Sequence, residues 1–148
     1  MKVTRRPALE TDTDFARFVH HQAYREVSER QFGPWDEKAQ DEYFNGDWTS
    51  AAFEIVLCDG VPCGYVRIED RDDDIHVHEL VLLPEFQGQG IGSSLLRQLM
   101  ERASRRRVPV RLETFHANRA LHLYRRLGFQ EMGRTETQIL MEWSSDQG

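Results

Sequence analysis

Apolar residues recur at helical spacing along the first third of the chain. A short strand is expected at residues 3–7, and Thr11-Asp12-Thr13-Asp14 then offers side-chain oxygens that cap a helix. Gly33-Pro34 ends this helix, because proline lacks the amide hydrogen that a helix needs. A second helix is expected over about 35–44.

The pattern changes after residue 50, where short apolar runs predict strands. The expected strands are 51–57, 64–68, 76–83, 108–115, 129–132 and 137–143. The expected helices among them are 91–103, which is amphipathic, and 117–127, which Gly128 stops. Two helices, a meander of strands and then alternating strands and helices predict a single α+β domain over residues 1–143, with a tail at 144–148.

Composition narrows the class of protein. The chain has 148 residues, of which 39% are hydrophobic and 30% charged, as in a folded globular domain. No apolar run approaches the roughly 20 residues of a membrane span, and no secretory signal is evident, so we expect a cytoplasmic protein without a membrane partner. The net charge of −6 argues against a nucleic-acid surface and suits a cationic substrate. Cys58 and Cys63 are expected to be free thiols, and no metal is expected.

The most informative stretch is the glycine-rich segment Gln87-Gly88-Gln89-Gly90-Ile91-Gly92, between a strand and a helix. Glycines allow close approach of a ligand, and the first amides of a helix form an anion site that suits a pyrophosphate. One alternative is a turn that needs glycine for packing alone. Another is a dinucleotide fold with Glu113 on the ribose, although Ser93 stands where the third fingerprint glycine belongs.

This segment resembles the Q/R-x-x-G-x-G/A loop of the GNAT (GCN5-related N-acetyltransferase) superfamily. Leu123-Tyr124-Arg125-Arg126-Leu127-Gly128-Phe129 resembles the L-Y-x-x-x-G-F segment of the same superfamily. The resemblance implies a three-layer α/β/α fold with a mixed, mostly antiparallel, splayed central sheet. It also implies transfer of an acetyl group from acetyl-CoA to a primary amine, by direct attack in a ternary complex. A small molecule is preferred over a protein as acceptor, and a non-catalytic acyl-CoA-binding or regulatory module of the same fold remains the alternative.

The resemblance also implies which residues bind the cofactor. Main-chain groups of the strand before the loop would pair with the pantetheine arm, and the loop amides would hold the pyrophosphate. Asn118 departs by one position from the family's usual asparagine, so it either contacts coenzyme A or caps the following helix. The expected cofactor-binding residues are Leu80, Val81, Leu82, Gln87, Gly88, Gln89, Gly90, Ile91, Gly92, Ser93 and Asn118.

For catalysis, the resemblance implies Tyr124 as general acid, against the alternative of a packed aromatic. Glu79 is the first choice of general base, Glu113 competes with it, and a water chain is the third alternative. Strand alternation places His76 and His78 on one face and Glu79 on the other.

The acceptor is expected to be a small-molecule amine. Glu26, Trp35 and Asp36 are the expected acceptor-binding residues, against the alternative that they belong to solvated helix faces or the core. The resemblance also allows a homodimer.

Overall fold

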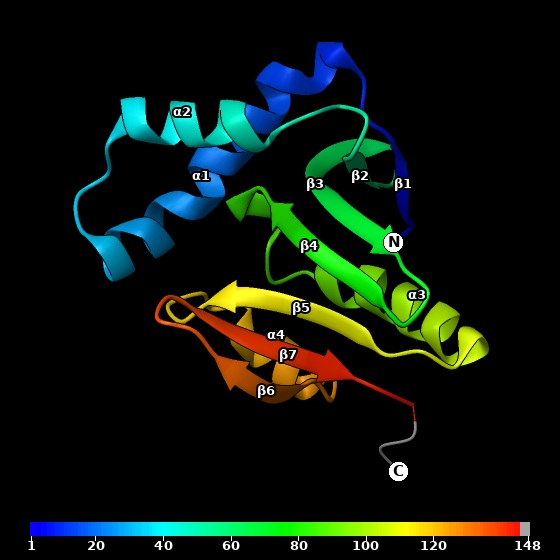
Figure 1. Ribbon diagram of the computed structural model, residues 1–148. Helices are drawn as coiled ribbons and strands as arrows, with labels where there is room; N and C mark the ends of the chain where they lie inside the picture. The colour runs from blue at the N-terminus through cyan, green and yellow to red at the C-terminus, as the bar shows by residue number, and fades with distance from the viewer. Residues whose placement is uncertain (146–148) are drawn as a thin grey trace. The chain divides into compact units, whose positions relative to one another are not determined.

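The computed structural model describes residues 1–145, which form two compact units. The first unit comprises Met1–Arg67 and Leu80–Ile91, and the second comprises Ile68–Glu79 and the chain from Gly92 onward. The hydrogen-bonded strand order is β1-β2-β3-β4-β5-β7-β6, and β3 and β4 each run from one unit into the other (Figure 1). Residues 146–148 of the expected tail lie outside the described residues.

The first unit begins with the antiparallel strands β1 (Val3–Pro7), β2 (Glu54–Cys58) and β3 (Val61–Asp70). A 3-10 turn (Glu10–Asp12), α1 (Thr13–Phe32) and α2 (Glu37–Asp47) connect the first two strands, and a second 3-10 turn (Pro84–Phe86) follows the end of β4.

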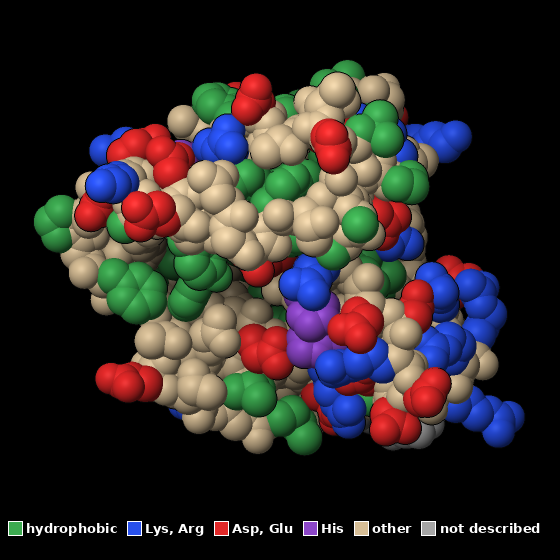
Figure 2. Space-filling view, turned by 45° about the horizontal axis from the view of Figure 1, so that its top comes forward, with side chains coloured by type: hydrophobic (Ala, Val, Ile, Leu, Met, Phe, Trp, Pro, Cys, Tyr) green, Lys and Arg blue, Asp and Glu red, His purple; other side chains and the backbone are tan. Residues whose placement is uncertain are grey.

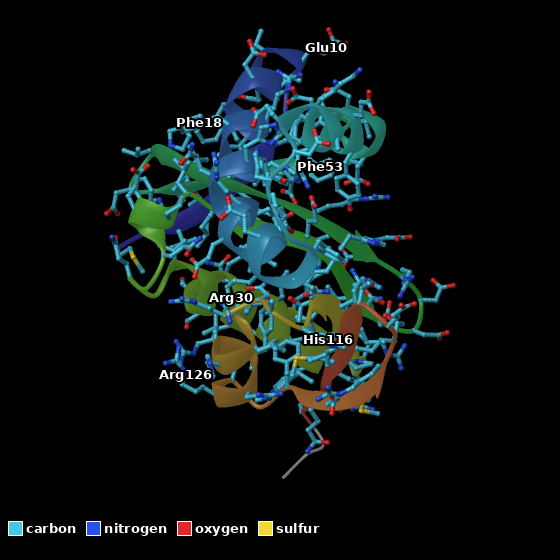
Figure 3. All side chains as sticks on the ribbon, turned by 90° about the vertical axis from the view of Figure 1, so that its left-hand side faces the viewer. Glu10, Phe18, Arg30, Phe53, His116 and Arg126 are labelled. Atoms are coloured by element: carbon cyan, nitrogen blue, oxygen red, sulfur yellow. The ribbon has the colours of Figure 1, made fainter. Side chains whose placement is uncertain are left out.

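The core of the first unit forms where α1 and α2 pack on strand residues. Ala16 and Val19 of α1 and Phe44 of α2 lie in one apolar cluster with Tyr65 and Val81 of the strands. Phe18 lies on the outer face of α1, with 54% of its surface exposed (Figure 3). Ala16 and Val19 are therefore the residues of α1 that face the strands.

The second unit contains the start of β4 (Ile75–Leu82) and a strand–helix series: α3 (Ile91–Arg106), β5 (Val110–Phe115), α4 (Leu121–Arg126), β6 (Gln130–Arg134) and β7 (Gln138–Trp143). β5 pairs antiparallel with β7, and β7 pairs antiparallel with β6. β4 and β5 are parallel, and their ladder runs from the Ile75–Val110 pair to the Val77–Leu112 pair. Both strands continue beyond that ladder, as the expected splay requires.

The predicted α+β class with a mixed sheet is confirmed. Several boundaries differ from the prediction, including those of α2, β2 and α4. Helix α2 continues through Asn45-Gly46. Strand β2 begins at Glu54 because residues 49–52 form a turn. Helix α4 begins at Leu121 because Asn118 organises a turn before it. No helix within residues 1–145 has the length and apolar character needed to cross a membrane.

Candidate active site

The glycine segment of the first unit is an exposed loop between β4 and α3. Gly88 and Gly90 have φ angles of +73° and +87°, in the left-handed region that favours glycine. A Cβ atom at Gly88 would meet nothing within 4 Å, so the space beside it is open. Helix α3 begins at Ile91, and the first amides of a helix have no acceptor within it. The loop therefore offers unpaired donors and a helix dipole to an anion.

The glutamines hold this loop from within, rather than pointing amides at a ligand. Gln87 donates from Nε2 to the Leu82 carbonyl at 3.0 Å, and Gln89 donates to the Glu85 carbonyl at 2.7 Å. The amide of Leu83 donates to Cys63 of β3 at 2.9 Å. These bonds tie the loop to the strand end on which Leu80, Val81 and Leu82 lie.

Gly92 has a packing role in the second unit. It is buried, and a Cβ atom there would lie 3.2 Å from the side chain of Leu123. Leu123 starts the second motif, so the two motif segments meet at this point. The neighbouring Ser93 is half-buried.

Tyr124 lies on the short helix α4 and is 6% exposed. Its ring packs at 5.9 Å from the ring of Phe129, and its carbonyl accepts from the Phe129 amide at 3.0 Å. Gly128, with φ of +99°, permits the reversal that brings the two rings together. The L-Y-x-x-x-G-F spacing thus places the C-terminal end of α4 so that the Tyr124 and Phe129 rings pack together.

Burial raises the pKa of the Tyr124 phenol to about 12. The Tyr124 hydroxyl has no hydrogen-bond partner within residues 1–145. Because every fully buried side-chain oxygen or nitrogen among those residues has a partner, the hydroxyl is not fully buried. The ring is therefore packed, and the phenol stays protonated at neutral pH. The packed and the acid roles of Tyr124 are compatible.

The second unit also contains a chain of charged groups at the start of β4 and β5. Arg71 donates to His76 Nδ1 at 2.7 Å, and His76 Nε2 lies 2.7 Å from Glu113 Oε2. Because the guanidinium has only donors, Nδ1 must accept, and the imidazole proton lies on Nε2, directed at Glu113. The rings of His76 and His78 stack at 4.2 Å, so they share a face as predicted. Figure 2 shows histidine, acidic and basic side chains gathered on one face.

Asp74 holds Arg71 of this charged network in place. It is 1% exposed, and it accepts from Arg71 at 2.7 Å and from Arg111 at 3.2 Å. The hydrogen bond from Arg71 holds the pKa of the Asp74 carboxyl below its usual range, and that from Arg111 adds to the effect. Of the two candidate bases, Glu113 is bound to His76, and Glu79 is half-buried further along β4.

Asn118 organises a turn before α4 and does not cap the helix, whose N-cap residue is Ala120 and has no side-chain cap. Its side-chain oxygen accepts from the Ala120 amide at 2.9 Å, and its amide group donates to Thr114 at 2.9 Å. The basic stretch on α3 is also paired, since Arg102 and Arg106 both bind Asp70, at 2.8 and 3.1 Å. Contact of Asn118 with coenzyme A stays a prediction.

The expected acceptor residues are not gathered into one group. Asp36 caps α2 by accepting from the Ala39 amide at 3.1 Å, and Glu26 lies 3.9 Å from Arg30. Trp35 donates to Glu37 Oε2 at 2.6 Å and packs edge-on against His21 at 5.3 Å.

The sequence analysis did not identify a cluster of titratable side chains formed by His21, Glu37 and Asp41. The four-residue spacing of Glu37 and Asp41, one helical turn, was the available signal. The neighbouring His20 is buried, and burial lowers its pKa to about 4.

Comparison with known proteins matches residues 20–129 to the Acetyltransferase (GNAT) family. An uncharacterized N-acetyltransferase of Methanocaldococcus jannaschii is 31% identical over 94 residues, which is 62% of this chain and 40% of that protein. The N-alpha-acetyltransferase RimI of Mycobacterium tuberculosis is 40% identical over 107 residues, covering 61% of this chain and 67% of that protein. This chain therefore spans less than half the length of the Methanocaldococcus relative.

Among solved structures, the PaiA N-acetyltransferase of Thermoplasma acidophilum, in complex with coenzyme A, superposes with a TM-score of 0.78. The alignment covers 97% of this chain and 99% of that one, at 16% identity. At this identity the likeness concerns the fold alone.

Proposed function

The chain belongs to the acetyltransferase (GNAT) family, and from this membership we propose that it transfers an acetyl group from acetyl-CoA to a primary amine. The observation that carries the proposal is the loop with Gly88 and Gly90 at positive φ, placed directly before the first amides of α3. A Cβ-free, exposed backbone at a helix N-terminus fits a pyrophosphate. The amides from Gly88 to Ser93 would bind that group, and main-chain groups of Leu80–Leu82 would bind the pantetheine arm.

In the proposed reaction the neutral amine attacks the thioester carbonyl, a C–N bond forms, and the C–S bond breaks. A main-chain amide of the β4 end would donate to the oxyanion that develops on the carbonyl. Tyr124 would give its proton to the departing thiolate, and its pKa of about 12 keeps it protonated until then. The amine's own proton goes to a base.

Glu79 is the proposed base, with Glu113 and a water chain as competitors. Glu113 already accepts from His76 at 2.7 Å, so it has a structural role in the charge chain of the second unit.

Direct attack is supported by the state of the thiols. Cys63 is fully buried, and burial raises its pKa to about 11, so it is not a reactive thiolate at neutral pH. Cys58 is half-buried at the end of β2. An acetyl-enzyme on Cys63 is therefore disfavoured.

The proposed acceptor is a small cationic amine, and the net charge of −6 supports a cationic acceptor. Glu26, Trp35 and Asp36 are the proposed contacts. A protein N-terminus is the second candidate, because one 40%-identical relative carries the name N-alpha-acetyltransferase. A non-catalytic acyl-CoA-binding module is the alternative of another class. A cytoplasmic location, a homodimer and a single domain over residues 1–143 stay predictions.

Calorimetry with acetyl-CoA tests the cofactor site. We expect micromolar binding by the native chain and loss of at least tenfold in affinity for Gly90→Asp, which places a carboxylate in the anion site. Gly90→Ala is the matched control, because it carries the same backbone strain at φ of +87° without the charge. No binding by the native chain would contradict the proposal.

If acetyl-CoA binds, a screen follows that compares small amines with peptides bearing a free N-terminus. Turnover of small amines supports the first acceptor, and turnover of peptides alone supports the second. Binding without turnover of either class would favour the non-catalytic module.

A further inference from the structure

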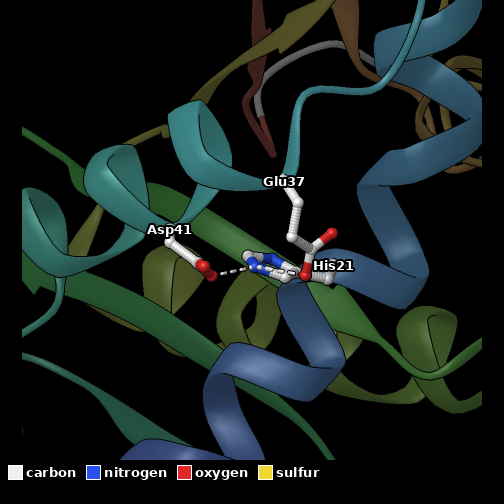
Figure 4. A group of neighbouring side chains, drawn as sticks. All are labelled: His21, Glu37 and Asp41. Carbon is white, nitrogen blue, oxygen red and sulfur yellow. Dashed lines mark hydrogen bonds and ion pairs between the residues drawn. The ribbon is translucent and has the colours of Figure 1, made fainter.

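Three side chains of types that can bind a metal meet between α1 and α2 of the first unit (Figure 4). His21 Nε2 lies 2.7 Å from Asp41 Oδ1 and 3.8 Å from Glu37 Oε1, and the three ligand atoms all lie within 4.8 Å of one another. We propose that His21, Glu37 and Asp41 form a divalent transition-metal site of the zinc class, which links the two helices. The sequence predicted no metal, because these ligands come from two helices and only Glu37 and Asp41 have a recognisable spacing.

The separations fit a metal with small side-chain movements. With metal–nitrogen and metal–oxygen distances of about 2.1 Å, ligand atoms in a tetrahedral site lie roughly 3.4 Å apart. The observed 2.7 and 3.8 Å fall on either side of that value. Glu37 has 65% of its side chain exposed and Asp41 has 42%, so both are able to adjust their rotamers. Water would take the fourth position.

The outer atoms of two ligands are held so that the inner atoms face the site. Trp35 Nε1 donates to Glu37 Oε2 at 2.6 Å, which leaves Oε1 as the oxygen nearer His21. His21 Nδ1 lies 2.9 Å from His20 Nδ1, so one of these nitrogens carries a hydrogen. Because the Asp41 carboxylate only accepts, His21 Nε2 carries the hydrogen in the metal-free protein and Nδ1 accepts from His20. Binding a metal requires the hydrogen of His21 to move to Nδ1, so that the Nε2 lone pair faces the metal. Metal-ligating histidines and carboxylates are typically oriented by such outer partners.

The position of the three side chains would also allow a bound metal to hold α1 and α2 together. Glu37 and Asp41 are one turn apart near the start of α2, and His21 lies in the middle of α1. A metal bound here would fix α2 against α1 through three side chains, whereas the metal-free protein has the His21–Asp41 pair. A ligand that binds the folded state alone stabilises it by mass action.

Zinc titration of the EDTA-treated, dialysed full chain tests the site by calorimetry and thermal unfolding. We expect one zinc ion per chain and a rise in Tm of about 5–10 °C at 100-fold excess over Kd. Asp41→Asn and Glu37→Gln should each weaken binding at least about tenfold, and His21→Gln should abolish it. Glu42→Gln, an exposed acid on the same helix, is the matched control and should bind like the native chain.

Cobalt gives a second readout that is independent of stability. Bound Co²⁺ should show the visible bands of a tetrahedral nitrogen–oxygen site and no thiolate charge-transfer band, which would arise if Cys58 were the ligand. The proposal fails if the native chain shows no saturable binding. It also fails if Asp41→Asn and Glu37→Gln bind zinc like the native chain, or if Cys58→Ser removes the binding.

Discussion

Gly64 on β3 lies against the backbone of Val81 on β4, so closely that a Cβ atom at position 64 would be 2.1 Å from the Val81 carbonyl oxygen. The same atom would lie 2.8 Å from the Leu82 side chain. Both contacts are shorter than a side chain tolerates, so glycine at position 64 is required by this approach. The strand end that it contacts is the segment proposed to bind the pantetheine arm.

Gly64→Ala should therefore reduce both stability and cofactor binding. Overpacking of this kind costs about 1–3 kcal/mol, and the displaced backbone of Leu80–Leu82 should weaken acetyl-CoA binding at least severalfold. Urea unfolding and calorimetry measure the two effects. Gly46→Ala in α2 is the control, because nothing lies within 4 Å of its Cβ position and alanine favours a helix. Native-like behaviour of Gly64→Ala would contradict the packing argument.

Tyr124→Phe should lower kcat by about 100-fold, with little change in the KM for acetyl-CoA, since it removes the proposed proton donor and keeps the ring. Steady-state kinetics with the acceptor found in the screen measure the effect. Phe129→Leu, which alters the packing partner and keeps the phenol, should retain most of the activity. Full turnover by Tyr124→Phe would assign Tyr124 to packing alone.

The raised pKa of Tyr124 also predicts a loss of stability at alkaline pH. Because the folded pKa of about 12 lies above the unfolded value near 10, this contribution is fully present below pH 10 and is lost as pH rises toward 12. At pH 11 the native chain should have lost about 1.4 kcal/mol to this group. Urea unfolding between pH 8 and 11 should show a flatter profile for Tyr124→Phe. Parallel profiles would contradict the burial of the phenol.

Asp74→Asn should destabilise the second unit by about 2 kcal/mol at pH 7, because it removes a charged acceptor from Arg71 and Arg111. The folded pKa of Asp74 is lowered, so its contribution is present above the unfolded value near 3.8 and is lost as pH falls through the folded pKa. The difference between variant and native chain should therefore shrink below pH 4. Urea unfolding at pH 7 and below pH 4 measures the difference. Asp73→Asn, at the exposed neighbouring position, should unfold like the native chain in both conditions.

Glu79 and Glu113 are distinguished by their conservative variants. Glu79→Gln should lower kcat at least about tenfold and move the acid limb of the kcat/KM profile, as loss of a general base does. Glu113→Gln keeps an oxygen that can accept from His76, so it should stay within about threefold of the native rate. The reverse pattern would make Glu113 the base, and two near-native variants would favour a water chain.

The local pattern of the chain determined most of the elements and both motifs. Helical spacing predicted α1, and the glycine run predicted the exposed loop with Gly88 and Gly90, because tolerance of positive φ is a property of glycine itself. The L-Y-x-x-x-G-F spacing likewise predicted a helix that stops at Gly128. These features depend on neighbours along the chain, which a sequence displays directly.

Only the tertiary structure decided which distant groups meet. Gly92 packs on Leu123, Glu113 accepts from His76, and His21 faces two carboxylates of the next helix. Asp36, which is proposed to contact the acceptor, also caps α2. Such contacts depend on how the elements pack and on the side-chain rotamers that this packing imposes. Side-chain partners are therefore set by proximity in three dimensions, which the spacing of residues along the chain does not show.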